Sequence, residues 1–106
     1  MLKQAQSVSD FEQTIQTQSP LLVEFFQPWC PYCKAFFPTL EAYASRPDSI
    51  EVMQVNGEEL PQVFEAYGIE SYPTVMVFVQ GQPVLKEEGG MEMARLEQFI
   101  AKGTSR

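Results

Sequence analysis

The run LLVEFF, from Leu21 to Phe26, most constrains the fold of this chain, because every residue in it except Glu24 is apolar. Ser19-Pro20 breaks any preceding helix just before the run begins. A short and almost continuous apolar run is typical of a strand that is covered on both faces, as in the middle of a parallel sheet. The sequence therefore predicts a central sheet with helices on both of its faces.

Helix and strand patterns alternate around this run. We expect a short strand near residues 2–6, then a helix capped by Ser9 with Glu12 as its capping-box partner, and then the strand over 21–26. A helix that begins at the cysteines and contains Pro38 should follow, and after it a strand over 50–55 and a helix that ends at Gly68. The chain should close with a hairpin that turns at Gln80-Gly81 and a helix over 91–102. Parallel crossovers followed by a hairpin predict an α/β fold, with a central mixed sheet of four to five strands flanked by helices on both faces. We expect residues 1–106 to form one domain.

Composition excludes several kinds of partner. The net charge is −7 with only seven Lys and Arg residues, so no basic surface is available for nucleic acid. No run of about 18 apolar residues is present, and we therefore expect no membrane association. The first residues are polar and do not resemble a secretory signal, which predicts a cytoplasmic protein.

The chain has no histidine, which excludes His-based metal sites, Ser/His/Asp triads and Cys/His nucleophile pairs. Its chemistry must use thiols, carboxylates or tyrosines. Cys30 and Cys33 are the only cysteines and lie in the stretch WCPYCK. In a reducing cytoplasm, two cysteines this close are more plausibly catalytic or metal-binding than a structural disulfide.

The spacing of the two cysteines suits the beginning of a helix. If Cys30 is the N-cap residue, Pro31 falls at the first helical position, where its fixed φ and missing N–H are tolerated. The amides of Tyr32 and Cys33 and the helix dipole then favour the thiolate of Cys30. We expect Cys30 to be the exposed nucleophile, and Cys33, one turn further on, to be the sheltered thiol that resolves a mixed disulfide.

Two other roles for the pair remain open from the residues alone. Two thiolates supply half of a four-coordinate zinc or iron–sulfur site, and the other ligands would have to come from a second chain or a small thiol. The pair can also be two inert buried thiols, although a proline-led helix start after a buried strand is a poor place to bury the first one. We expect no bound metal and no cofactor.

The chain resembles the thioredoxin family over nearly its whole length. VEFFQPWCPYCK is similar to the family's strand, tryptophan, CxxC pair and lysine, Pro38 matches a helix proline, and YGIESYPTVMVF matches the segment that ends in a cis-proline and a strand. The resemblance implies a thioredoxin fold, a redox disulfide between Cys30 and Cys33, and a cis bond before Pro73. It also implies a substrate surface, formed by Trp29, Pro31, Tyr32, Tyr72, Pro73 and Gly89.

Glu24 lies six residues before Cys30 in the apolar strand. Burial should raise the pKa of its carboxyl, so that it can exchange a proton with Cys33. Thioredoxins usually have aspartate here, and the disulfide isomerase branch is more similar to this sequence. Gln54 occupies the place where many family members have a lysine paired with that acid.

Pro31-Tyr32 between the cysteines is a departure, because thioredoxins typically have Gly-Pro and glutaredoxins have Pro-Tyr. Proline at the first helical position, and not the second, leaves the Tyr32 amide free to bond the thiolate. We therefore expect a more oxidising disulfide than in a Gly-Pro relative.

The sequence thus predicts a monomeric thiol:disulfide oxidoreductase that acts on protein disulfides. A disulfide reductase or a low-molecular-weight thiol would supply its electrons. A glutathione-dependent glutaredoxin-like enzyme, a non-enzymatic interaction module with this fold and a dimeric iron–sulfur carrier are the alternatives.

Overall fold

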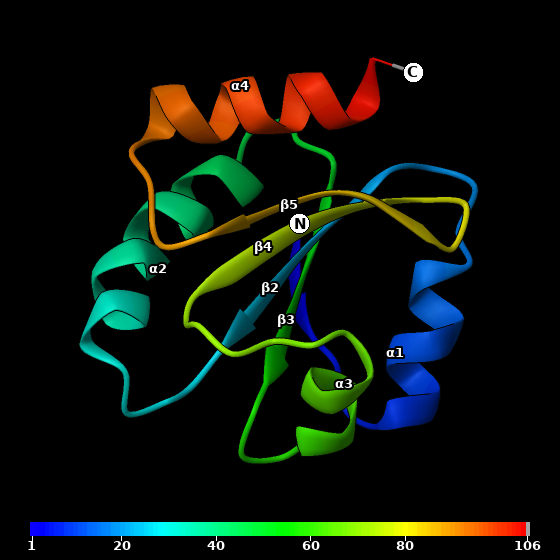
Figure 1. Cartoon of the computed structure of the whole chain (residues 1–106). Helices are drawn as coiled ribbons and strands as arrows, with labels where there is room; N and C mark the ends of the chain where they lie inside the picture. Colours follow the sequence, from blue (N-terminus) through cyan, green and yellow to red (C-terminus); the bar gives the residue numbers. More distant parts are fainter. Residues whose placement is uncertain (106) are drawn as a thin grey trace.

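A five-stranded mixed sheet lies between two pairs of helices in the computed structural model, which describes residues 1–105 (Figure 1). The strands are β1 (Leu2–Gln4), β2 (Leu21–Phe26), β3 (Glu51–Asn56), β4 (Thr74–Val79) and β5 (Gln82–Glu88), in the spatial order β1-β3-β2-β4-β5. The helices are α1 (Val8–Ile15), α2 (Pro31–Ala44), α3 (Pro61–Ala66) and α4 (Met93–Thr104). The predicted α/β fold is therefore confirmed, with five strands.

Strand β2 lies at the centre of the sheet, parallel to β3 and antiparallel to β4. Its side chains alternate between the two faces. Val23 and Phe25 enter the core beneath α1 and α3, whereas Leu22 enters the core beneath α2 and α4. Glu24 shares the face of Leu22, so its carboxyl points toward the side of the sheet that α2 covers.

The closing hairpin turns where the sequence predicts. Gln80 has a φ of 52° and Gly81 a φ of 83°, so both central residues of the two-residue turn are left-handed. This backbone matches the twist of the two antiparallel strands that it joins, and glycine adopts it without steric cost. Strands β4 and β5 pair along their whole length, with one register shift between Val77 and Phe78.

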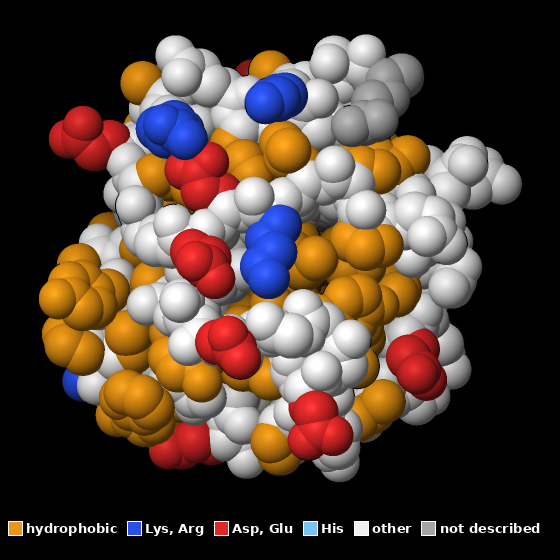
Figure 2. Space-filling view, in the orientation of Figure 1, with side chains coloured by type: hydrophobic (Ala, Val, Ile, Leu, Met, Phe, Trp, Pro, Cys, Tyr) orange, Lys and Arg blue, Asp and Glu red, His pale blue; other side chains and the backbone are white. Residues whose placement is uncertain are grey.

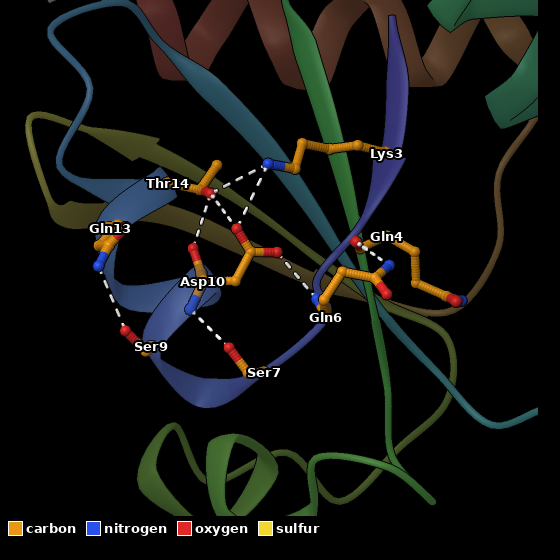
Figure 3. A network of polar contacts seen from close by, with 8 residues as sticks. All are labelled: Lys3, Gln4, Gln6, Ser7, Ser9, Asp10, Gln13 and Thr14. Carbon is orange, nitrogen blue, oxygen red and sulfur yellow. Dashed lines mark hydrogen bonds and ion pairs between the residues drawn. The ribbon is translucent and has the colours of Figure 1, made fainter.

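The predicted start of the first helix is wrong by two residues. Helix α1 begins at Val8, and its cap is Ser7, whose hydroxyl accepts the Asp10 N–H at 3.0 Å (Figure 3). The Asp10 carboxylate in turn accepts the Gln6 N–H at 2.8 Å and forms an ion pair with Lys3 at 3.6 Å. Ser7 therefore takes the capping role that the sequence assigned to Ser9, and Asp10 reaches back to the residue before the cap and not to the cap itself.

Helix α4 begins at Met93, two residues later than expected, because Glu92 has an extended backbone and takes the cap position.

Phe37 has the pattern of a core residue, but its side chain is 36% exposed. Within residues 1–105, no helix is long and apolar enough to span a bilayer.

Gly103 marks a close contact between α4 and the sheet, and it yields a prediction. A Cβ atom on Gly103 would lie 2.8 Å from the Cβ of Val77, which is fully buried. Overpacking of this kind costs ~1–3 kcal/mol, and the better helix propensity of alanine offsets at most about 1 kcal/mol. We expect Gly103→Ala to lower the free energy of unfolding by roughly 1 kcal/mol in urea denaturation.

A double variant tests whether the contact with Val77 is the cause. Val77→Ala removes the two methyl groups, which would lie 2.8 and 2.9 Å from the new Cβ, and keeps the Val77 Cβ, so Gly103→Ala should cost less in that background than in the wild type but still be destabilising. Strictly additive losses would show that the methyl groups of Val77 are not a source of strain at residue 103.

Candidate functional site

The two cysteines lie at the beginning of α2, in the positions that their spacing predicts. Cys30 is the N-cap residue with an extended backbone (φ −81°, ψ 119°), and Pro31 is the first helical residue. The Cys33 N–H donates to the Cys30 Sγ at 3.4 Å. Both thiols are free. The sulfur of Cys30 thus lies at the positive end of the helix dipole, with one amide directed at it.

The second expected hydrogen bond to this sulfur, from the Tyr32 N–H, is not formed within the described residues 1–105. Cys30 caps α2 as Ser7 caps α1, in each case through the amide three residues on. Tyr32 itself points outward, and its side chain is 73% exposed. The expected effect of Pro31-Tyr32 on the disulfide therefore has no support from a Tyr32 hydrogen bond.

The expectation that Cys33 is sheltered is confirmed and the expectation that Cys30 is exposed is wrong, because each is only 4% exposed. Cys30 is covered since its Sγ lies 3.6 Å from the carbonyl oxygen of Tyr72, which accepts a hydrogen bond from the thiol. The exposed groups around the pair are instead the neighbouring aromatic side chains, with Trp29 59% exposed. In the view of Figure 2, apolar side chains gather at the lower left, where α2 begins in Figure 1.

The loop before β4 completes this side of the site. The bond between Tyr72 and Pro73 is cis. The Gly89 N–H donates to the Pro73 carbonyl at 2.7 Å, and Gly89 is left-handed with a φ of 93°. The Tyr72 ring packs edge-on against Trp29 with a centroid distance of 6.0 Å. Three segments that are far apart in the sequence therefore meet around Cys30.

Glu24 lies inside the protein and is only 1% exposed. The β2–β3 register places it opposite Gln54, whose Nε2 donates to the Glu24 Oε1 at 2.8 Å. Burial raises the pKa of Glu24 from 4.5 to about 7, and the hydrogen bond from Gln54 lowers it by a smaller amount. The carboxyl can therefore gain or lose a proton near neutral pH.

Cys33 is the more strongly perturbed thiol. Its pKa is raised to about 12, chiefly by burial; a backbone hydrogen bond from Gln27 lowers it by a smaller amount, and the nearby Cys30 and Glu24 add to the increase. Negative charge on either neighbour thus opposes ionisation of Cys33.

A cavity of about 430 Å³ connects Glu24 with Cys33. Its lining also includes Gln4, Phe26, Gln27, Pro28, Lys34, Phe37 and Gln54. The Gln27 Oε1 is buried there without a hydrogen-bond partner. Sequence reasoning missed this cavity and Gln27, because a glutamine after an apolar run gives no sign that it lines a polar interior.

The site has the elements of dithiol chemistry and few of metal chemistry. Cys30 and Cys33 can yield two electrons by forming a disulfide, and the Glu24 carboxyl lines the same cavity as Cys33. Within the described part of the chain, no three Cys, Asp or Glu side chains group together as metal ligands.

Comparison with known proteins gives the family. The thioredoxin family model matches residues 3–102. Thioredoxin 1 of Nostoc sp. is 36% identical over 92 residues, which is 86% of both chains. The thioredoxin of Griffithsia pacifica is 36% identical over 102 residues, which is 95% of this chain and 94% of that one.

The fold leads to the same family. The structure of Plasmodium falciparum thioredoxin superposes with a TM-score of 0.87 at 29% identity, and covers 94% of this chain and 97% of that one. These matches fit the thioredoxin interpretation better than a glutaredoxin-like enzyme or a binding module. This chain belongs to the thioredoxin family and is a protein thiol:disulfide oxidoreductase.

Proposed function

We propose that Cys30 is the nucleophile of this oxidoreductase and Cys33 the resolving thiol. The observation that carries the proposal is the hydrogen bond from the Cys33 N–H to the Cys30 Sγ, because it stabilises negative charge on that sulfur. Burial, which disfavours charge, keeps Cys33 protonated. The two thiols thus differ in electrostatic environment, although they are equally buried.

The reaction proceeds by two exchanges. The Cys30 thiolate attacks one sulfur of a protein disulfide, which breaks the S–S bond and releases the first substrate thiolate. Cys33 then loses its proton and attacks the Cys30 Sγ, which releases the second substrate sulfur as a thiolate. The substrate has gained two electrons, and the enzyme is left with a disulfide between Cys30 and Cys33.

Glu24 is the proposed proton acceptor for Cys33 in the second exchange. In the mixed disulfide, Cys30 carries no charge, so one of the effects that raise the pKa of Cys33 is absent. The Glu24 carboxylate lines the same cavity as Cys33, and a single water there can carry the proton from thiol to carboxylate. Glu24 returns the proton when the disulfide is reduced again.

The proposed substrate surface surrounds the buried sulfur of Cys30. Trp29 and Tyr32 provide exposed aromatic area, and Pro31, Tyr72, Pro73 and Gly89 form the rest of the rim. An extended segment of substrate lying across the loop before β4 would bring its disulfide to Cys30. The partners are therefore protein disulfides with an accessible S–S bond.

The oxidised pair must be reduced after every turnover. We infer that a disulfide reductase supplies these electrons in the cytoplasm, where reducing equivalents are maintained, and not a low-molecular-weight thiol. The chain acts as a monomer in this proposal, since both cysteines and Glu24 come from one copy.

Trapping the intermediate tests the order of attack. With Cys33→Ser, the first exchange proceeds and the second cannot, so a covalent one-to-one adduct with a disulfide substrate such as insulin should accumulate. Non-reducing electrophoresis and mass spectrometry measure the adduct, and Cys30→Ser is the matched control that should form none. An adduct that requires Cys33 and not Cys30 would reverse the assignment.

A variant lacking both thiols that keeps the cellular function would indicate a binding module.

The buried Glu24 predicts a pH-dependent cost to stability. Between about pH 4.5 and pH 7 the unfolded carboxyl releases its proton while the folded one keeps it, so the free energy of unfolding falls as pH rises. Above that interval, the cost is constant at roughly 3 kcal/mol. Glu24→Gln should therefore be more stable than the wild type by up to ~3 kcal/mol near pH 8, and by little near pH 4.

Urea denaturation of both proteins at the two pH values measures this difference, because contributions from all other groups cancel between wild type and variant.

The same variant should slow the attack of Cys33 on the mixed disulfide by ~10²-fold if Glu24 accepts the proton. A stability gain that does not depend on pH would show that the Glu24 carboxyl is not neutral in the folded state.

The electron donor can be identified by supplying one source at a time. With NADPH and a thioredoxin reductase, insulin reduction should continue over many turnovers, whereas glutathione with glutathione reductase should support it at least about tenfold more slowly. The readout is NADPH consumption at equal substrate. Faster turnover with glutathione would favour the glutaredoxin-like alternative.

A further inference from the structure

A second cavity, of about 290 Å³, lies beside the thiols on the opposite side of α2 from Glu24. It is lined by Tyr32, Ala35, Phe36, Gly90, Met91 and Glu92. Gly90 and Phe36 lie close together in it, since a Cβ on Gly90 would be 3.2 Å from the Phe36 Cβ. The cavity is therefore largely apolar, and Glu92 is its one charged residue.

The Glu92 carboxylate has no partner within residues 1–105. Glu92 is the N-cap residue of α4, but its side chain makes no capping hydrogen bond. The ion pairs of the described chain join Lys3 to Asp10, Arg46 to Asp48 and Glu97, and Arg95 to Glu87, and none involves Glu92. Its side chain is exposed, so its charge is available to a bound molecule.

Tyr32 supplies a second group that attracts a cation. Its ring is 73% exposed at the same cavity, and the face of an aromatic ring binds ammonium and guanidinium groups. The methylene stem of a lysine or arginine can lie along Ala35 and Met91 while its charged head reaches Glu92. An acidic side chain placed there would face Glu92 with no basic lining residue to compensate.

The cavity is close to the reacting sulfur. Tyr32 follows Cys30 by two residues, so their Cα atoms are at most ~7 Å apart. The hydrogen bond between Gly89 and Pro73 joins the start of the β5–α4 connection to the loop that contacts Cys30. Figure 2 shows carboxylates on this side of the molecule, over β5 and the beginning of α4. An extended substrate rises about 3.3 Å per residue, so the residue that enters the cavity lies two or three positions from the substrate cysteine.

We propose that the cavity between Tyr32 and Glu92 selects protein substrates that carry a lysine or arginine two or three residues from the reactive cysteine. The proposal rests on the proposed function, because it assigns a substrate class to the same thiol pair. The net charge of −7 acts in the same direction, by attracting basic substrates over longer distances.

Matched peptides test this selection. Each peptide carries one cysteine, which is joined in a mixed disulfide to thionitrobenzoate. The peptides of one set differ only in having arginine, glutamine or glutamate two residues from that cysteine. In a second set, the variable residue lies three residues from the cysteine. Each turnover releases one coloured thionitrobenzoate and one peptide thiol and leaves the enzyme disulfide, which NADPH and a thioredoxin reductase reduce to the dithiol again. We expect wild-type kcat/KM to be about 3- to 20-fold higher for arginine than for glutamate in at least one set.

Two charge variants separate the cavity from the overall charge. Glu92→Gln should reduce the arginine-to-glutamate ratio to within about twofold. Glu41→Gln is the matched control, since it removes the same charge from an exposed position on α2, nine residues and ~13 Å along the helix from Tyr32, and should keep the wild-type ratio. Tyr32→Leu should reduce the ratio partly, because it removes the ring and leaves the carboxylate.

The outcomes distinguish this proposal from the proposed function. If the glutamine peptides react through Cys30 but neither set shows a preference for arginine, the selection is wrong and the oxidoreductase mechanism stands. Equal losses of preference in Glu92→Gln and Glu41→Gln would assign the effect to net charge and overturn the role of the cavity. If no peptide reacts, the assignment of Cys30 as nucleophile fails first.

Discussion

The burial of β2 on both faces is the constraint on which the rest of the structure depends. Its backbone is paired on both sides, with β3 and β4, and its side chains complete two separate cores. Any polar group on this strand must therefore find its hydrogen-bond partner inside the protein. The carboxyl end of β2 leads directly to the cysteines, so the reactive loop is anchored to the central strand of the sheet.

Glu24 is the one ionisable group on that strand, and its environment links stability to chemistry. The charged form of a buried carboxylate is stabilised less by a neutral amide partner, as Gln54 is for Glu24, than by a cationic partner. Gln54 orients the carboxyl without neutralising it. The cost in stability and the ability to exchange a proton near neutral pH thus have the same physical origin, which is the removal of Glu24 from water.

Much of the fold could be predicted from the sequence, because its strongest signals are local. The apolar run at 21–26, the hairpin turn at Gln80-Gly81 and the helix start at Cys30 each follow from a few neighbouring residues. The wrong predictions are of two kinds. Some required a choice between similar local patterns, such as Ser7 or Ser9 as the helix cap, and others concerned side chains that are buried by segments distant in the sequence. Cys30 is covered by Tyr72 and Gln27 lines a cavity with Glu24, and neither contact leaves a pattern in the nearby sequence.

The periodicity of α2 directs neighbouring side chains into two different cavities on its two sides. Cys33, Lys34 and Phe37 line the cavity with Glu24, whereas Tyr32, Ala35 and Phe36 line the cavity with Glu92. Residues three or four apart share a helix face, so each set of side chains forms its own stripe. Cys30 precedes both stripes as the cap, and its sulfur lies where they begin. The groups that we propose to transfer protons and those that we propose to contact the substrate can therefore differ independently between relatives, since a substitution on one stripe leaves the lining of the other cavity unchanged.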